Sequence, residues 1–157
     1  MLQTVGFALA HALGSLRLGG TLCTLAVLQQ ADARSIGRYE APSIPESIAA
    51  AHGHLTEALN EGHWAALVYD GFVTIPERGR TDALIAEVIL PGGDVAGRVI
   101  QAYRRARRLG LPIIGRGPGL IGEAIIDPAL DGGGAASAIE AGFREHPSGS
   151  GLLRHRE

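Results

Sequence analysis

The chain has 157 residues, 46% of them hydrophobic and 4% aromatic, and all fourteen positive side chains are arginines against sixteen acidic ones, for a net charge of −2. A charge so close to neutral gives no general attraction to nucleic acid or to anionic membranes, so neither is an expected partner. The absence of lysine excludes Schiff-base chemistry and lysine-dependent phosphate sites, because a guanidinium group keeps its proton in a protein.

This length is typical of one domain, which we expect over residues 1–147, with residues 148–157 as a polar, glycine-rich and mobile tail. Cys23 is the only cysteine, so an internal disulfide is impossible and the cytoplasm is the expected location. The apolar stretch 5–28 is interrupted by Arg17 and by glycines, which favours buried globular structure over a membrane span. Because small side chains bury little area each, a subunit interface could supplement the core, which keeps a homodimer open.

The start of the chain predicts a helix, a strand and a connection. Leucine and valine recur at three- and four-residue steps over residues 2–16, the period of one helical face, and Gly19-Gly20 is expected to end that helix. The uncharged run 21–28 predicts a buried strand, although its leucines fit a helix nearly as well. The polar, mixed residues 29–42 predict a connection.

A capping box marks the start of the next helix. In Ser43-Ile-Pro-Glu46 the serine hydroxyl can accept from a backbone N–H while the glutamate reaches back. Pro45 suits the first helical turn, where its missing N–H is not needed. We expect this helix to run to about Asn60.

Two β-rich runs predict an antiparallel hairpin. They cover residues 64–75 and 81–90 and are separated by Pro76-Glu-Arg-Gly-Arg80, a connection with turn-forming residues. Apolar residues lie on both faces of the first run, which indicates a central strand.

The length of the hairpin loop decides which side chains face each other. A five-residue loop places Tyr69 opposite Glu87, and a four-residue loop places Asp70 there instead, as a pair of carboxylates. We favour the first, since like charges opposed across strands are destabilising. Paired carboxylates can perform acid–base catalysis, so Asp70 and Glu87 are candidate catalytic residues.

Residues 95–109 carry the clearest amphipathic pattern of the chain and predict a helix, with Asp94 as its N-cap and Gly110 just beyond its end. Arginines occupy most of its polar side. We expect this face to bind a phosphate, a carboxylated ligand or an acidic protein partner through bidentate pairing, with a solvated face that has no partner as the plainer alternative. The candidate ligand-binding arginines are Arg104, Arg105, Arg108 and Arg116.

Gly117, Gly119 and Gly122 spell G-x-G-x-x-G after a candidate strand at residues 111–114. In dinucleotide-binding folds such glycines let the backbone approach a pyrophosphate. Only 35 residues follow Gly122, which is too few for the rest of such a fold. A tight turn is therefore the main interpretation, and a phosphate-contacting loop with Gly117 and Gly119 is the alternative.

His52, His54 and His63 lie close in the sequence, together with two glutamates. On a helix this spacing brings only two such side chains to one side, whereas a zinc site needs three or four ligands. We therefore predict no metal site and no cofactor, and keep His54 as a third candidate acid–base residue. Cys23 lies in an uncharged run, where a lone thiol is usually a small buried hydrophobic group.

These elements predict an α+β fold: a single two-layer domain in which an antiparallel, hairpin-containing sheet is packed by about four helices. The helices are expected at residues 2–16, 43–60, 95–109 and 135–145, while residues 120–126 fit a strand or a helix. The expected function is a small cytoplasmic binding or assembly domain whose arginine-rich face takes an anionic ligand or an acidic partner. The alternative is a small enzyme acting on a phosphorylated or carboxylated metabolite, with Asp70, Glu87 or His54 as the acid–base group.

Overall fold

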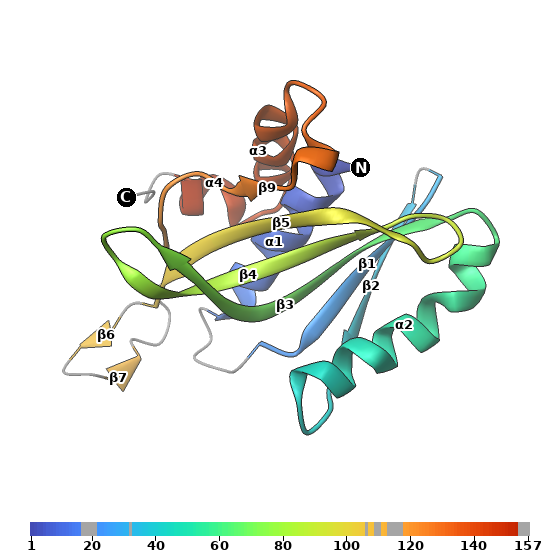
Figure 1. The fold of residues 1–157 in the computed structure, drawn as a ribbon, viewed down its shortest axis with the longest axis horizontal. Coiled ribbons are helices and arrows are strands. Elements are labelled where there is room, and N and C mark those ends of the chain that lie inside the picture. The colour runs from blue at the N-terminus through green and yellow to red at the C-terminus, as the bar shows by residue number, and fades with distance from the viewer. Residues whose placement is uncertain (17–21, 32, 106, 109–110, 113–117, 154–157) are drawn as a thin grey trace.

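The computed structural model describes residues 1–16, 22–31, 33–105, 107–108, 111–112 and 118–153 (Figure 1). It is an α+β fold built on one antiparallel sheet of seven strands, which confirms the expected class and the presence of the hairpin in the sheet. The helices are α1 (Leu2–Leu16), α2 (Ile44–Asn60), α3 (Ala135–Glu145), the short α4 (Gly149–Leu153) and the 3-10 turn η1 (Pro128–Leu130).

Across the sheet, the strands follow the order β2-β1-β3-β4-β5, with two short strands beside β5. The long strands are β1 (Thr24–Gln30), β2 (Ala33–Tyr39), β3 (Trp64–Ile75), β4 (Gly79–Ile89) and β5 (Val95–Arg104). The two short strands are β8 (Gly119–Leu120) and β9 (Ile125–Ile126), while β6 (Arg107–Arg108) pairs with β7 (Leu111–Pro112).

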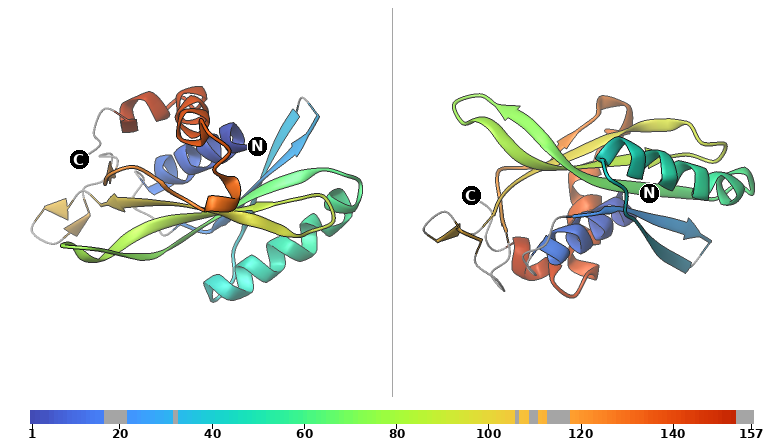
Figure 2. Two further views of the ribbon diagram at one scale, coloured as in Figure 1. Left: turned by 45° about the horizontal axis from the view of Figure 1, so that its top comes forward. Right: turned by 90° about the horizontal axis from the view of Figure 1, so that it is seen from below.

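Helices lie on both faces of the sheet (Figure 2). Helix α1 packs on one face, and α3 packs on α1, so that Phe143 joins the same core. Helix α2 lies on the other face over β1 and β3, where Leu55 and Leu59 are buried against Ala26 and Leu67. None of the helices in the described ranges is long and apolar enough to cross a membrane.

Several expected elements are confirmed. Three of the four expected helices are α1, α2 and α3, the hairpin is β3 and β4, and the strand expected over residues 21–28 is β1. The capping box of α2 is formed: the Glu46 N–H donates to Ser43 Oγ at 3.4 Å, and the Ser43 N–H donates to a Glu46 carboxylate oxygen at 3.1 Å.

The helix expected over residues 95–109 is wrong, because residues 95–104 form strand β5. Seven of its residues pair with β4, and pairing along a central strand overrides a helical hydrophobic pattern. Gly97 also disfavours a helix. Side chains alternate along a strand, and Arg104 and Arg105 accordingly do not share one continuous arginine face. In the described part of the chain, three helices of eleven residues or more surround the sheet, not four.

Residues 29–42 are not the expected connection, because they contain the end of β1 and all of β2. Strand β2 lies at the edge of the sheet with most of its side chains exposed, so it lacks the apolar pattern that would have revealed it. Within the expected tail at 148–157, residues 149–153 form α4, which packs on α1 and α3, while residues 154–157 lie outside the described ranges.

Candidate functional site

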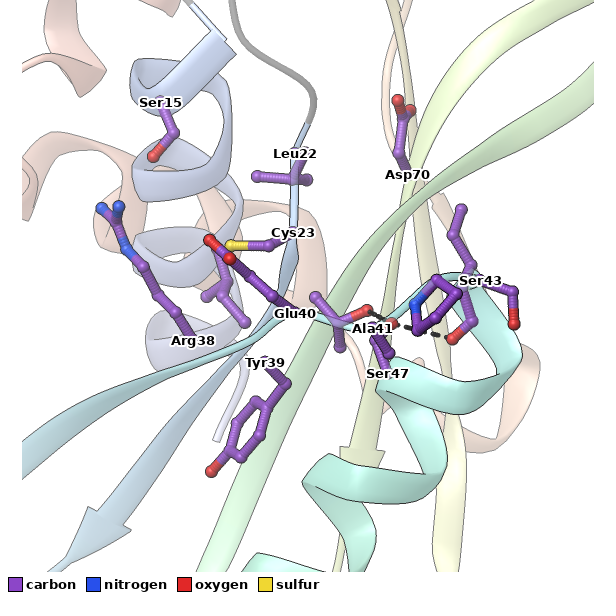
Figure 3. A pocket seen from close by; sticks show the side chains of 14 residues that line it. Ser15, Leu22, Cys23, Arg38, Tyr39, Glu40, Ala41, Ser43, Ser47 and Asp70 are labelled. Atoms are coloured by element: carbon purple, nitrogen blue, oxygen red, sulfur yellow. Dashed lines mark hydrogen bonds between the residues drawn. The ribbon is translucent and has the colours of Figure 1, made fainter.

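A cleft of about 730 Å³ opens at the end of the sheet, next to the last turn of α1 (Figure 3). Helix α1 contributes Ser15 to one wall, and the start of β1, the end of β2, one residue of β3 and the first turn of α2 form the rest. A cleft of this size is typical of sites that bind small molecules.

Three residues from adjacent strands form a row along this cleft. The registers of β1 with β2 and of β1 with β3, continued to the start of β1, place Cys23 between Glu40 and Asp70. Residues opposite each other in a sheet share one face, so the row presents a carboxylate, a thiol and a second carboxylate. Figure 3 shows Asp70 across the cleft from Cys23 and Glu40. We call these three residues the cleft row.

Asp70 is held in place through both of its oxygens. Oδ1 accepts from the Tyr103 hydroxyl at 2.9 Å, and Oδ2 accepts from Arg105 Nη2 at 2.9 Å. Burial, the largest cause, raises the pKa of Tyr103, so its hydroxyl stays a donor. Asp70, which was predicted to be catalytic, and Arg105, which was predicted to bind a ligand, therefore form an ion pair whose charges compensate each other.

Arg38 brings a positive charge to the cleft, and the sequence analysis did not single it out. It lies two positions before Glu40, and its Nη2 is 3.4 Å from His11 Nε2. Among the described residues no carboxylate forms an ion pair with Arg38, whereas Arg34 on the same strand pairs with Glu145 at 2.5 Å. The charge of Arg38 is thus uncompensated at the wall of a ligand-sized cleft.

His11 belongs to a pair of histidines between α1 and the end of α3. Its Nδ1 lies 3.3 Å from His146 Nε2, and the Ser148 N–H donates to His146 Nδ1 at 3.2 Å. Burial lowers the pKa of both histidines, and the charge of Arg38 lowers that of His11 further. Both rings are therefore held neutral in the folded protein at a pH where free histidine is already protonated.

We expect this histidine pair to make the protein less stable in mild acid. The unfolded chain binds protons near the ordinary pKa of 6.5 and the folded chain binds them only at lower pH. The contribution of the pair to stability is therefore constant above that value, and stability falls as the pH drops through it. Urea unfolding followed from about pH 7.5 to about pH 5.5 measures the loss. His146→Gln should flatten the dependence and His54→Gln, on exposed α2, should not; equal profiles for both variants would contradict the assignment.

Glu87, the second candidate catalytic residue, lies on the other face of the sheet, beside α2. It stands opposite Leu67, so neither register considered for the hairpin is right: the loop between Ile75 and Gly79 has three residues. The Tyr69 hydroxyl nevertheless donates to Glu87 Oε1 at 3.0 Å, as a diagonal pair. The expected tyrosine–carboxylate hydrogen bond is present, and the pair of opposed carboxylates is not.

Arg98 completes the surroundings of Glu87. Its Nε donates to Oε1 at 2.9 Å and its Nη2 lies 2.8 Å from the same oxygen, while Glu87 itself is only 5% exposed. This is a compensated buried charge that joins three strands. His54, the third candidate, is exposed on α2 and packs against Tyr39 with ring centroids 5.7 Å apart. Neither Glu87 nor His54 lines the cleft.

The predicted ligand-binding residues are not assembled as the sequence pattern suggested. Arg104 is exposed on β5 and pairs in register with Gly119 of β8, whereas Arg105 turns to Asp70. Arg108 lies in β6, and the placement of its side chain, of Arg116 and of Gly117 falls outside what the structure describes. Of the described members of this set, Arg105 alone joins the cleft, through Asp70.

The described residues contain no group of three histidine, cysteine, aspartate or glutamate side chains arranged to hold a metal ion. The chain matches no family model, no curated protein and no solved structure. The fold and the cleft therefore define the protein as an α+β domain with a ligand-sized cleft at the end of its sheet, and its function is argued from that cleft.

Proposed function

We propose that the protein is a binding domain whose cleft takes a small molecule with an anionic group, held by Arg38. The observation that carries this proposal is the uncompensated guanidinium of Arg38 at the wall of a cleft of about 730 Å³. A guanidinium offers a planar set of donors that suits a carboxylate or a phosphate. An anionic ligand is also what the arginine-rich face of residues 95–109 led us to expect. In this proposal, however, the arginine that binds the ligand is Arg38.

The first turn of α2 adds to the same wall. Ser43 and Ser47 line the cleft, and Ser47 is buried with its hydroxyl 2.5 Å from that of Thr24. These hydroxyls supply donors and acceptors at the wall of the cleft, while the Glu46 carboxylate in the same turn already caps the positive end of the helix dipole. The turn therefore adds polar contacts, and the preference for an anionic group rests on Arg38.

The alternative of an enzyme for a carboxylated or phosphorylated metabolite rests on Asp70, the one candidate acid–base residue that lines the cleft. Asp70 already accepts from Tyr103 and Arg105 at 2.9 Å each, and this arrangement suits a positioning role. Binding without turnover is accordingly the function that the geometry supports best. An acidic protein partner for the predicted set of Arg104, Arg105, Arg108 and Arg116 stays a prediction.

The test uses Cys23, the only cysteine of the chain, as a reporter inside the cleft. Pentanoate and inorganic phosphate are titrated while the rate of Cys23 alkylation by iodoacetamide is followed. We expect at least one of the two anions to slow alkylation, and about 0.5 M salt to weaken the effect.

Arg38→Gln should weaken the binding of that anion about threefold to fivefold, which is the worth of one favourable ion pair at an exposed site. Arg144→Gln removes the same charge from an exposed position on α3 and should leave the affinity unchanged. Alkylation that neither anion slows, or equal affinity in Arg38→Gln and the unmodified chain, would refute the proposal.

A further inference from the structure

The cleft holds a second uncompensated charge, of the opposite sign. Glu40 has no hydrogen-bond or ion-pair partner among the described residues, although it lines the same cleft as Arg38. The two residues lie two positions apart at the end of β2, on the same side of the strand, where Cα atoms are about 7 Å apart. They form no ion pair with each other. A carboxylate and a guanidinium thus stand side by side, each open to a ligand.

Asp70 reinforces the negative end of this arrangement without adding net charge. Its ion pair with Arg105 compensates it, yet each of its oxygens keeps a lone pair beyond the bond that it accepts from Tyr103 or Arg105. Cys23, between Asp70 and Glu40, is a small side chain. The cleft row therefore offers acceptors from two strands around a thiol, with no positive side chain in the row itself.

We infer that the ligand is dipolar: its anionic group pairs with Arg38, and a cationic amino group at its other end is received between Glu40 and Asp70. This inference rests on the proposed function and adds the second charge of the ligand. A purely anionic molecule would leave Glu40 unpaired beside its own negative charge, and a purely cationic one would meet Arg38. Only a molecule with both charges compensates both side chains.

The spacing of the two side chains limits the length of the ligand. The Cα atoms of Arg38 and Glu40 are about 7 Å apart along the strand, so we expect the two charges of the ligand to lie further apart than those of an α-amino acid. An amino group on the fifth carbon of a straight chain reaches that far. Leu22 and Leu25, which also line the cleft, would contact the methylene groups between the charges. The expected class is therefore an ω-amino acid or a molecule with the same spacing of charges.

The experiment compares three probes of one length, pentanoate, 5-aminopentanoate and pentylamine, together with glycine, by their effect on the alkylation rate of Cys23. The full chain is used. We expect 5-aminopentanoate to bind about threefold to fivefold more tightly than pentanoate, the range of one ion pair at a partly open site, and glycine and pentylamine to bind more weakly than pentanoate.

Two variants test whether Glu40 is the side chain that receives the amino group. In Glu40→Gln, 5-aminopentanoate should no longer bind more tightly than pentanoate, and the affinity for pentanoate should be equal or higher. Glu57, exposed on α2 and outside the cleft, is the control: in Glu57→Gln the gain in affinity from the amino group should remain. Pentanoate that binds through Arg38 without any gain from the amino group overturns the dipolar ligand and leaves the proposed function standing. A gain that survives in Glu40→Gln also overturns it. Pentylamine binding more tightly than both other five-carbon probes overturns the inference and the proposed function together.

Discussion

Gly142→Ala is expected to destabilise the protein by at least about 3 kcal/mol, a large part of the stability of a domain of this size. Gly142 lies in α3 where the backbone of α1 passes so close that a Cβ atom would fall 2.8 Å from the Phe7 nitrogen and nearer still to the Gln3 carbonyl. Gly6 of α1 makes the reciprocal contact with the backbone at Ile139. Because both obstacles are backbone, no side chain can turn aside, and the two helices would have to separate.

Gly53→Ala is the matched control for this change. Gly53 lies inside α2 with no atom within 4 Å of the position of an added Cβ. The same substitution should there raise stability by about 0.5–1 kcal/mol, because alanine favours a helix. Urea unfolding followed by circular dichroism measures both changes. A Gly142→Ala protein as stable as the unmodified chain would show that α1 and α3 are not in backbone contact.

Glu87→Ala is expected to cost about 2–3 kcal/mol, because it removes a buried carboxylate that is hydrogen-bonded to Tyr69 and Arg98. Arg98 can turn toward solvent, which keeps the loss below that of a fully buried ion pair. Asp82→Ala, on the same strand and away from this network, should change stability little. If Glu87→Ala were as stable as Asp82→Ala, Glu87 would not hold the three strands together.

Tyr69 gives this substitution a spectroscopic signature. Burial first, and then the charge and hydrogen bond of Glu87, raise the pKa of Tyr69 to about 12. The folded chain thus keeps a proton that the unfolded chain loses, so stability falls as the pH rises above the ordinary value of 10. In Glu87→Ala burial still raises the pKa of Tyr69 and the charge of Arg98 still lowers it, so the phenolate absorbance of Tyr69 should appear at lower pH than in the unmodified chain. If the pKa of Tyr69 were the same in Glu87→Ala as in the unmodified chain, Glu87 would not be one of its causes.

Local signals in the sequence predicted local structure well. The capping box at Ser43 fixed the start of α2, and the two β-rich runs around Pro76 specified the β3–β4 hairpin. Both signals depend on contacts between residues near each other in the chain, which the sequence contains in full. The exact register of the hairpin did not follow, because loops of three, four or five residues fit the same letters.

The two wrong elements have a common physical reason. Over residues 95–109 the apolar side chains satisfy a helical period, but β4 supplies a strand partner along β5, and a single sequence does not reveal that partner. Strand β2 was missed for the opposite reason: at an exposed edge it needs no apolar face. In both cases a tertiary neighbour, and not the local pattern, selects the conformation.

The cleft lay beyond local prediction as well. Asp70 and Arg105 were each singled out, but their ion pair joins β3 to the end of β5 across 35 positions of the chain. Cys23 and Glu40 meet Asp70 only through the pairing of β1 with both of its neighbours. Arg38 could have been noticed from the alternation of charged and other residues over 34–40, a pattern typical of an edge strand.

The most direct test of the cleft as a ligand site is a titration of the isotopically labelled full chain with 5-aminopentanoate, followed by the amide signals in nuclear magnetic resonance spectra. We predict that the shifts centre on residues 22–25, 38–47 and 70, the walls of the cleft, and that Arg38→Gln strongly reduces them. Shifts confined to residues 98–108, or no shifts at millimolar probe, would contradict the assignment of the cleft as the ligand site.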